Sequence, residues 1–439
     1  MDLASRSLRQ NHAKTVIETI KNKLFSLEFI EQHKKGKNDF IRNRKLNFVN
    51  LVLFILQRGK SSLQRELEKF FASVERGKEI TASALTHARK KLCPEVFISL
   101  NNALVESFYN TANSISTSRI RRILAVDGSR LELPDNKEIV EEFGRANKQP
   151  DAKPLGIVSA LFDVVNKVVL DSSINPADAS ENHLAFSHLG RVRQGDLVIL
   201  DRGYKCLWLM LGVVQKGADY LIRLPVNAFK EVGLFEKSNE MEAIVTLHPT
   251  PKVIQQCLDL GIEAMPLKVR LVKVILDTGE KELLVTSLID SMMYPVTIFQ
   301  ELYTLRWGVE EEYKTMKSVL EVEQFSGKSP HAVRQEFHAA IFLSNLQSVI
   351  SRGKDVQERI EKKTEGRKYE YQENRTSALF FVKEGLIALF TGTSLIQVLT
   401  HLEEKIIKNI LPIRPGRCYE RRFTRYRLPK FIPNKRALA

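Results

Sequence analysis

Two short apolar runs, Ile123–Val126 and Leu197–Leu200, are each followed directly by an aspartate, with a glycine within the next two residues. Short apolar runs that end at turn signals are typical of strands buried on both faces of a sheet. Residues 123–224 place such runs in the order strand, hairpin, helix, strand, helix, strand. This order predicts an α/β layer arrangement with a mixed sheet.

The elements expected in this core are the strands 123–126, 155–163, 167–174, 197–200 and 220–224 and the helices 181–192 and 207–216. An alternating pattern then predicts strands at 244–247, 267–276 and 282–289, which indicates a β-rich insertion. Pro295 is expected to open one long helix that reaches Lys317. Further helices are expected over 332–350 and 376–389, with a polar, charge-rich loop over 352–375 between them.

The segment before the core is predicted to be helical, with helices over 47–57, 61–71, 82–92 and 94–112. Ser61 is expected to open the second helix with a capping box, and Thr81 to cap the third. The second and third helices flank a polar turn, and the third is basic. This pair suggests a helix-turn-helix that brings Arg89 and Lys90 to a DNA groove, with a solvated helix face as the alternative.

The chain of 439 residues carries 67 Lys and Arg against 52 Asp and Glu, a formal net charge of +15. An excess of this size favours a polyanionic partner, although a merely basic soluble protein is the alternative. Within residues 412–439, Arg421, Arg422 and Arg425 lie among interleaved aromatic residues. We expect this segment to track nucleic-acid phosphates or to serve as a protein–protein arm.

The four cysteines are scattered, and neither they nor the nine histidines show the spacing of a zinc site. The first residues lack the apolar core of a signal peptide. The longest apolar run is too short to span a membrane. The sequence therefore predicts a soluble cytoplasmic protein with no membrane partner.

The helix expected from Pro295 carries two stripes of different character. At about 100° per residue, Tyr303, Arg306, Glu310 and Lys317 share a narrow arc beside an apolar stripe. A surface helix normally backs its apolar stripe with mixed solvated charge. A hydroxyl, a guanidinium, a carboxylate and an ammonium in one file instead suit a site that holds a metal ion and phosphates together.

Asp127, Asp201 and Glu310 could converge, because two of them follow strands of one sheet and the third lies on a helix that can pack on it. Clustered carboxylates repel unless a cation neutralises them. Oxygen ligands without His or Cys select Mg²⁺ or Mn²⁺. Two such ions about 3.5–4 Å apart would promote an in-line displacement at phosphorus. With the basic flanks, this set predicts phosphoryl transfer on a polynucleotide.

Other acids, and ordinary turn chemistry, compete with this interpretation. An Asp followed by Gly is common in turns. Asp163 and Asp171 lie in or beside the second and third strands, and either could replace one of the two aspartates. Glu311 and Glu312 lie about 100° and 200° around the helix from Glu310, so we expect them to be solvated or salt-bridged.

The spacing Tyr303-x2-Arg306-x3-Glu310-x6-Lys317 resembles the Y-R-E-K signature of DDE transposases of the insertion sequence 4 family. The two aspartates add to the likeness, because Ala-Val-Asp-Gly-Ser and Leu-Asp-Arg-Gly-Tyr are similar to the segments around the family's first and second aspartates. The resemblance implies a ribonuclease-H-like mixed-sheet core with a β-rich insertion between the second Asp and the Glu.

The resemblance also implies cut-and-paste movement of a DNA element. By that likeness the three acids are catalytic and bind two Mg²⁺ or Mn²⁺ ions for nicking and strand transfer. Tyr303, Arg306 and Lys317 would contact phosphates at the transposon end, and Trp307 would stack on a flipped base or serve in packing. The partners would be terminal inverted repeats and target DNA, held by a homodimer in a synaptic complex at a prokaryotic nucleoid.

These expectations divide the chain into six parts. They are an N-terminal segment (1–40), a helical DNA-binding domain (41–118), the first part of the catalytic core (119–225), the β-rich insertion (226–290), the second part of the core with the Glu helix (291–350), and a C-terminal helical region with a basic tail (351–439). Two other functions stay open, namely a non-catalytic DNA-binding regulator derived from a transposase and a hydrolytic nuclease without strand transfer.

Overall fold

The computed structural model describes residues 11–41, 46–59, 61–74, 80–111, 120–146, 151–275 and 279–414. The chain divides into two compact units. One comprises residues 1–113, 131–156 and 314–439, and the other comprises residues 114–130 and 157–313. We call the first the helical unit and the second the sheet unit, and each is described by itself.

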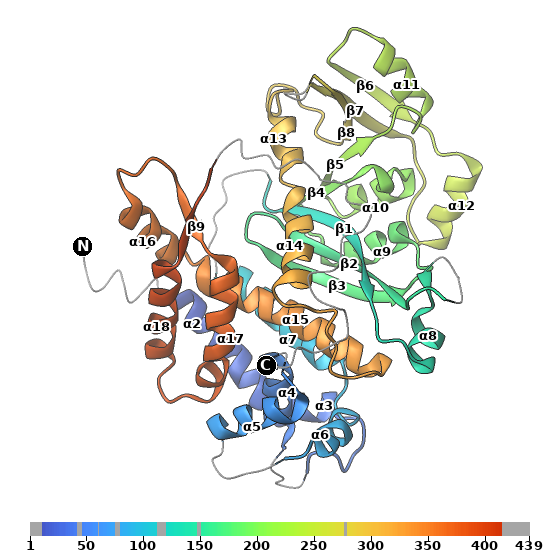
Figure 1. The fold of residues 1–439 in the computed structure, drawn as a ribbon. Coiled ribbons are helices and arrows are strands. Elements are labelled where there is room, and N and C mark those ends of the chain that lie inside the picture. Colours follow the sequence, from blue (N-terminus) through green and yellow to red (C-terminus); the bar gives the residue numbers. More distant parts are fainter. Residues whose placement is uncertain are drawn as a thin grey trace. The chain divides into compact units, whose positions relative to one another are not determined.

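An eight-stranded sheet organises the sheet unit, in the order β3-β2-β1-β4-β5-β8-β7-β6 (Figure 1). The strands are β1 Ile123–Glu132, β2 Leu155–Asp163, β3 Val168–Pro176, β4 Leu197–Leu200, β5 Asp219–Leu224, β6 Glu242–Leu247, β7 Leu267–Ile275 and β8 Lys281–Thr286. The central strands β1, β4 and β5 are parallel, and β8, β7 and β6 continue the sheet in antiparallel pairing. The expected mixed sheet is confirmed.

The core of the sheet unit explains why these runs form strands. Leu197 and Ile199 of β4, Leu221 of β5 and Leu284 of β8 are buried in one apolar cluster. The cluster also contains Phe299 of helix α13 (Ile298–Thr304), so this helix packs on the sheet. Four consecutive apolar residues in β4 can all be buried because a parallel strand is covered on both faces.

The helical unit is built from groups of helices that lie far apart in sequence. They are α2 Asn11–Phe25, α3 Leu27–His33, α4 Phe48–Gln57, α5 Leu63–Val74, α6 Ala82–Arg89, α7 Glu95–Thr111, α8 Lys137–Phe143, α15 Pro330–Ser351, α16 Lys354–Thr364, α17 Arg375–Thr391 and α18 Leu395–Lys408. Two short strands, β9 Tyr371–Glu373 and β10 Ile410–Pro412, pair antiparallel. The expected helical regions before and after the sheet are confirmed, and the Thr81 cap accepts a hydrogen bond from the N–H of Ala84.

Helix α15 is the centre of the helical unit, and it is buried along nearly its whole length. A buried acid on this helix, Glu336, collects two arginines from the N-terminal part of the chain. Arg58 Nη2 lies 2.7 Å from one carboxylate oxygen, and Arg89 Nη1 lies 2.8 Å from the other. The Ser326 N–H and hydroxyl also donate to it. Two cations and one acid therefore fasten α4 and α6 to α15.

The single long helix expected from Pro295 is wrong, because the chain forms α13 and then α14 (Trp307–Ser318). Leu305 and Arg306 make a tight turn between them, in which the N–H of Arg306 donates to Tyr303 O over 3.1 Å. The turn rotates the stripes relative to each other. Tyr303 and Arg306 become buried, whereas the apolar side chain of Leu305 is 38% exposed.

Two further expectations differ from the structure. The region 352–375, expected to be a loop, contains α16 and β9. The insertion 226–290 holds two helices besides its strands, α11 (Lys230–Lys237) and α12 (Pro251–Asp259). Its strands join the central sheet through β8, which pairs with β5. Alternation of apolar and polar residues predicts strands, but it does not predict which sheet they join.

The Glu336 ion pairs generate a prediction on stability. Glu336→Gln should leave two guanidiniums in the helical unit without their carboxylate, which costs about 3–5 kcal/mol of unfolding free energy. The matched control is Glu141→Gln, because Glu141 makes an exposed pair with Lys137 on α8. It should cost about 0.5 kcal/mol or less. Urea unfolding measures both, and equal losses would contradict the assignment.

The same site predicts a dependence on pH. Burial alone would raise the pKa of Glu336, but Arg58, Arg89 and Ser326 bring it from the ordinary 4.5 to about 2. Since the pKa is depressed in the folded state, the stabilisation is complete above about pH 4.5 and disappears as the pH falls toward about 2. Urea unfolding between about pH 6 and pH 3 should show a steeper loss for the wild type than for Glu336→Gln.

Candidate active site

The first two predicted acids lie side by side on neighbouring parallel strands. Strands β1 and β4 pair with Ala125 beside Ile199. Continuing this register by two residues places Asp127 opposite Asp201. Asp201 follows the last residue of β4, as expected. Asp127 lies inside β1, which runs on to Glu132, so the expected end of this strand at Val126 is wrong.

Glu310, near the start of α14, acts electrostatically on the carboxylate of Asp127. The pKa of Asp127 is raised to about 6, mainly by burial and also by the charges of Glu310 and Asp201. The N–H of Gly128 and the charge of Arg306 oppose this rise. The structure thus brings the three predicted carboxylates into one electrostatic neighbourhood, although they are far apart in sequence.

Arg306 is the cation of this neighbourhood. It is only 3% exposed, and its Nη2 donates to Glu310 Oε1 over 2.8 Å. Its guanidinium carbon lies 5.7 Å from the centre of the Tyr303 ring and 5.5 Å from that of Trp307. Its Nε is buried and makes no hydrogen bond to the described residues. Arg306, which the sequence predicts to contact a DNA phosphate, is therefore paired with Glu310 in this structure.

Asp201 has two hydrogen-bond donors that converge on one oxygen. The Tyr303 hydroxyl donates to Asp201 Oδ1 over 3.1 Å, and Arg223 Nε donates to the same oxygen over 3.2 Å. Burial alone would raise the pKa of Asp201, but the N–H of Arg202 and the charges of Arg306 and Arg223 lower it. Sequence reasoning missed Arg223, which stands in no motif.

A fourth acid was also missed. Glu181, the first residue of α9 (Glu181–Ser187), lies against the backbone beside Asp127, because a Cβ added at Gly128 would come within 3.2 Å of its carboxylate carbon. Its charge acts on Tyr204, whose buried hydroxyl makes no hydrogen bond to the described part of the chain. The Tyr313 hydroxyl donates to Asp127 O over 2.8 Å. Glu181 opens an ordinary helix, so no pattern singles it out.

The competing acids have other partners. Asp163 accepts hydrogen bonds from the N–H groups of Val165 and Asn166 and closes the turn after β2. Asp171 lies 2.8 Å from His188 Nδ1. Glu311 is exposed as expected, but Glu312 is buried rather than solvated.

The remaining predicted DNA contacts are dispersed. Trp307 is 42% exposed in the sheet unit. Lys317 belongs to the helical unit, where burial lowers its pKa against the charges of Glu323 and Glu132. Lys90 is exposed, whereas Arg89 is buried on Glu336. Their contacts with DNA stay predictions. Arg421, Arg422 and Arg425 lie outside the described residues.

The donor set fits a hard divalent cation. The three predicted ligands are carboxylates, whose oxygens are the ligands that Mg²⁺ and Mn²⁺ prefer. Within the described ranges, no three His, Cys, Asp or Glu side chains already stand at metal-binding distance. Residues Asp127, Asp201 and Glu310 would hold such a cation once Glu310 is no longer shared with Arg306.

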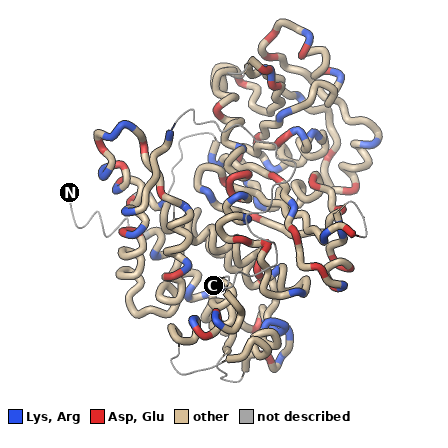
Figure 2. The backbone as a smooth tube through the Cα atoms, in the orientation of Figure 1, with Lys and Arg blue, Asp and Glu red and all other residues tan. Residues whose placement is uncertain are grey.

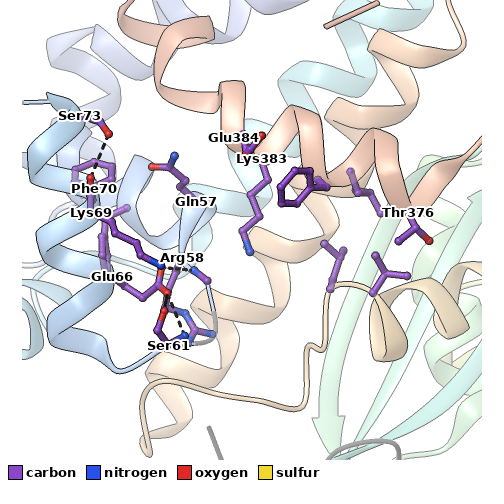
Figure 3. Close-up of a pocket in the computed structure, with 16 residues that line it drawn as sticks. Gln57, Arg58, Ser61, Glu66, Lys69, Phe70, Ser73, Thr376, Lys383 and Glu384 are labelled. Atoms are coloured by element: carbon purple, nitrogen blue, oxygen red, sulfur yellow. Dashed lines mark hydrogen bonds between the residues drawn. The ribbon is translucent and has the colours of Figure 1, made fainter. Parts of the chain in front are cut away.

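A separate hollow of about 590 Å³ lies in the helical unit between α4, α5 and α17 (Figure 3). Phe54, Phe70 and Phe380 contribute apolar walls, and Lys383 borders it. The carboxylate of Glu66 accepts hydrogen bonds from Gly59 and Ser61 at its edge. The lining includes none of the three predicted catalytic acids.

No helix in the described part of the chain is long and apolar enough to cross a membrane. Basic and acidic residues are interspersed over both units (Figure 2).

Comparison with known proteins places these observations in a family. Residues 118–346 match the family model described as "Transposase DDE domain". "Transposase InsG for insertion sequence element IS4" of Escherichia coli (strain K12) is 23% identical over 271 residues, which are 61% of this chain and 60% of that protein. "Putative transposase InsZ" of the same strain is 29% identical over 107 residues, 24% of this chain and 36% of that protein.

Among solved structures, "Cryo-EM structure of piggyBac transposase synaptic complex with hairpin DNA" matches 92% of this chain and 87% of that chain, at 12% identity and a TM-score of 0.46. A similarity of this size has no bearing on function. The family match spans strands β1 to β8 and all three acids, since it runs from before β1 into α15. The chain therefore belongs to the transposase DDE domain family, within the insertion sequence 4 group of DDE transposases.

Proposed function

We propose that this protein is a DNA transposase that cleaves DNA at the ends of a transposon and joins them to target DNA. The observation that supports this most is the placement of Asp127 opposite Asp201 with Glu310 acting on the same carboxylate. Three acids that repel one another are costly in a protein that only binds DNA. Family membership supports the reaction, although the matched stretch spans about three fifths of the InsG transposase.

Two Mg²⁺ or Mn²⁺ ions complete this proposal. When bound, such ions activate the attacking oxygen and stabilise the leaving oxygen of an in-line displacement at phosphorus. The residues Asp127, Asp201 and Glu310 would hold them. Tyr303 fixes one oxygen of Asp201 by its hydrogen bond, and Tyr313 fixes the backbone of Asp127. Tyr303 thus orients a carboxylate, and Tyr313 the backbone that carries another, before DNA arrives.

The DNA contacts follow from the same geometry. Arg306 is paired with Glu310, so a cation that takes over Glu310 would release the guanidinium for a phosphate of the transposon end. Trp307 is exposed enough to stack on a base. The inverted repeats of a transposon require two ends to be brought together, which favours a homodimer in the synaptic complex.

The alternative functions make different predictions. A regulator derived from a transposase would bind DNA without a need for metal and would cut nothing. A hydrolytic nuclease would use the same three acids but would yield no joined product. Detection of DNA joined to a target therefore separates transposition from hydrolysis.

The proposal predicts that Asp127→Asn, Asp201→Asn and Glu310→Gln each lower cleavage of DNA carrying the cognate inverted repeats by about 10³-fold or more. The reason is that stabilisation by the metal is worth several kcal/mol, and each 1.36 kcal/mol is a factor of ten in rate. Glu311→Gln is the matched control on the same helix, since Glu311 is exposed, and it should stay within about twofold. Full activity in any of the three would sink the metal assignment.

The basic C-terminal segment predicts a strong dependence on salt. If it and the helical unit make six to ten phosphate contacts, affinity should fall about 10³–10⁵-fold between 50 and 200 mM salt. Replacing Arg421, Arg422 and Arg425 together by Ala should reduce the slope of log affinity against log salt by about 3. Filter binding or fluorescence anisotropy measures this slope. An unchanged slope would indicate that the segment contacts protein rather than phosphates.

A further inference from the structure

Backbone pairing places Arg223 beside Asp201. Strands β4 and β5 are parallel, with Leu200 opposite Ile222. Continuing the register by one residue puts Asp201 and Arg223 opposite each other on the same face of the sheet. The hydrogen bond from Arg223 Nε to Asp201 Oδ1, over 3.2 Å, joins these two neighbours. The contact thus follows from strand register rather than from a flexible loop.

The other side of the Arg223 guanidinium is held by the insertion. Strand β8 pairs antiparallel with β5, with Leu284 opposite Arg223, so Glu282 is its diagonal neighbour on the same face. Arg223 Nη1 donates to Glu282 Oε1. The side chain of Glu282 is 12% exposed and that of Arg223 is 23% exposed, so solvent screens this pair less than a surface ion pair.

The guanidinium also has an aromatic neighbour. Its central carbon lies 5.8 Å from the centre of the Tyr303 ring, and the Tyr303 hydroxyl donates to the same oxygen of Asp201 as Arg223 does. Two donors on Oδ1 fix the orientation of the Asp201 carboxylate and hence the position of its other oxygen, Oδ2. A glutamate, a tyrosine ring and a strand register together restrict the arginine to one position.

We propose that Arg223 is a positioning residue for Asp201, and that Glu282, supplied by the insertion, holds Arg223 in place. The inference rests on the proposed function, because only there does Asp201 bind a metal ion. Residues that hydrogen-bond a metal-binding carboxylate commonly set its orientation and its affinity for the metal. The insertion, in this arrangement, contributes to the active site through β8.

One competing role for Arg223 has the opposite sign. A guanidinium beside Asp201 could act only as a counter-ion that a divalent cation must displace. Loosening Arg223 by removing its ion pair with Glu282 would then strengthen metal binding. If Arg223 orients the carboxylate, loosening it weakens metal binding. The direction of the change therefore decides between the two roles.

The test uses Glu282→Gln in the full-length protein, which removes the ion pair without changing the shape of the side chain. Glu242→Gln is the matched control. Glu242 also lies in the insertion, but on β6, where it accepts a hydrogen bond from Arg270 of β7 instead of from Arg223. Arg223→Lys is the second variant, because it keeps the charge and loses the Nε donor.

The first readout is binding of Mn²⁺ to the DNA-free protein, followed by electron paramagnetic resonance. Glu282→Gln and Arg223→Lys should each weaken it by about tenfold, and Glu242→Gln should stay within twofold. The second is the Mn²⁺ concentration that gives half-maximal cleavage, which should rise in parallel. The double variant should be no worse than Arg223→Lys, since both changes act on one contact. Urea unfolding shows that each variant is folded.

Unchanged or tighter Mn²⁺ binding in folded Glu282→Gln, with an active wild type, would overturn the positioning role alone. Equal weakening in Glu242→Gln would also overturn it, because the effect would then be general to the insertion. A wild-type protein that binds no Mn²⁺ and cuts no inverted-repeat DNA would overturn the proposed function, and the inference with it.

Discussion

The parallel pairing of β1, β4 and β5 is the constraint on which the active site depends. It places Asp127, Asp201 and Arg223 in one row across three neighbouring strands. All four residues of β4 are buried, so a slip by one residue would bring the charged Asp201 into apolar surroundings. A slip by one residue would turn every side chain of the strand to the other face. Hydrophobic burial in the strands thus fixes the polar row that follows them.

Opposed charges within this row support the proposal that it is a functional site. Two guanidiniums, of Arg306 and Arg223, pair with the carboxylates of Glu310 and Asp201, whose charges help to raise the pKa of Asp127. A protein that used these groups only for stability would do as well with apolar side chains of similar volume. Such locally unfavourable charges are expected where function requires them and the surrounding fold supplies enough stability to offset them. Here the surrounding fold is a buried sheet with helix α13 packed on it.

The helical unit shows why a basic residue cannot be assigned a partner from its position in a sequence. Arg89 and Lys90 are consecutive in a short basic helix, yet Arg89 is buried against Glu336 while Lys90 is exposed. Glu336 lies more than two hundred residues further along the chain, and no local pattern links the two. Whether an arginine neutralises a buried acid or faces DNA depends on which distant helix packs beside it.

The sequence by itself determined the α/β class, most strands to within two residues and the helical flanks, and it singled out the three acids, whose catalytic role stays a prediction. These features are local, because apolar periodicity, capping residues and motif spacing are written in neighbouring residues. Only the tertiary structure decided that the helix breaks at Leu305–Arg306, that Glu181 and Arg223 join the site, and that the insertion extends the central sheet. Each of these features depends on strand register and on burial between segments that are distant in sequence. Such contacts set the energy of a side chain, but the residues next to it in the sequence do not reveal them.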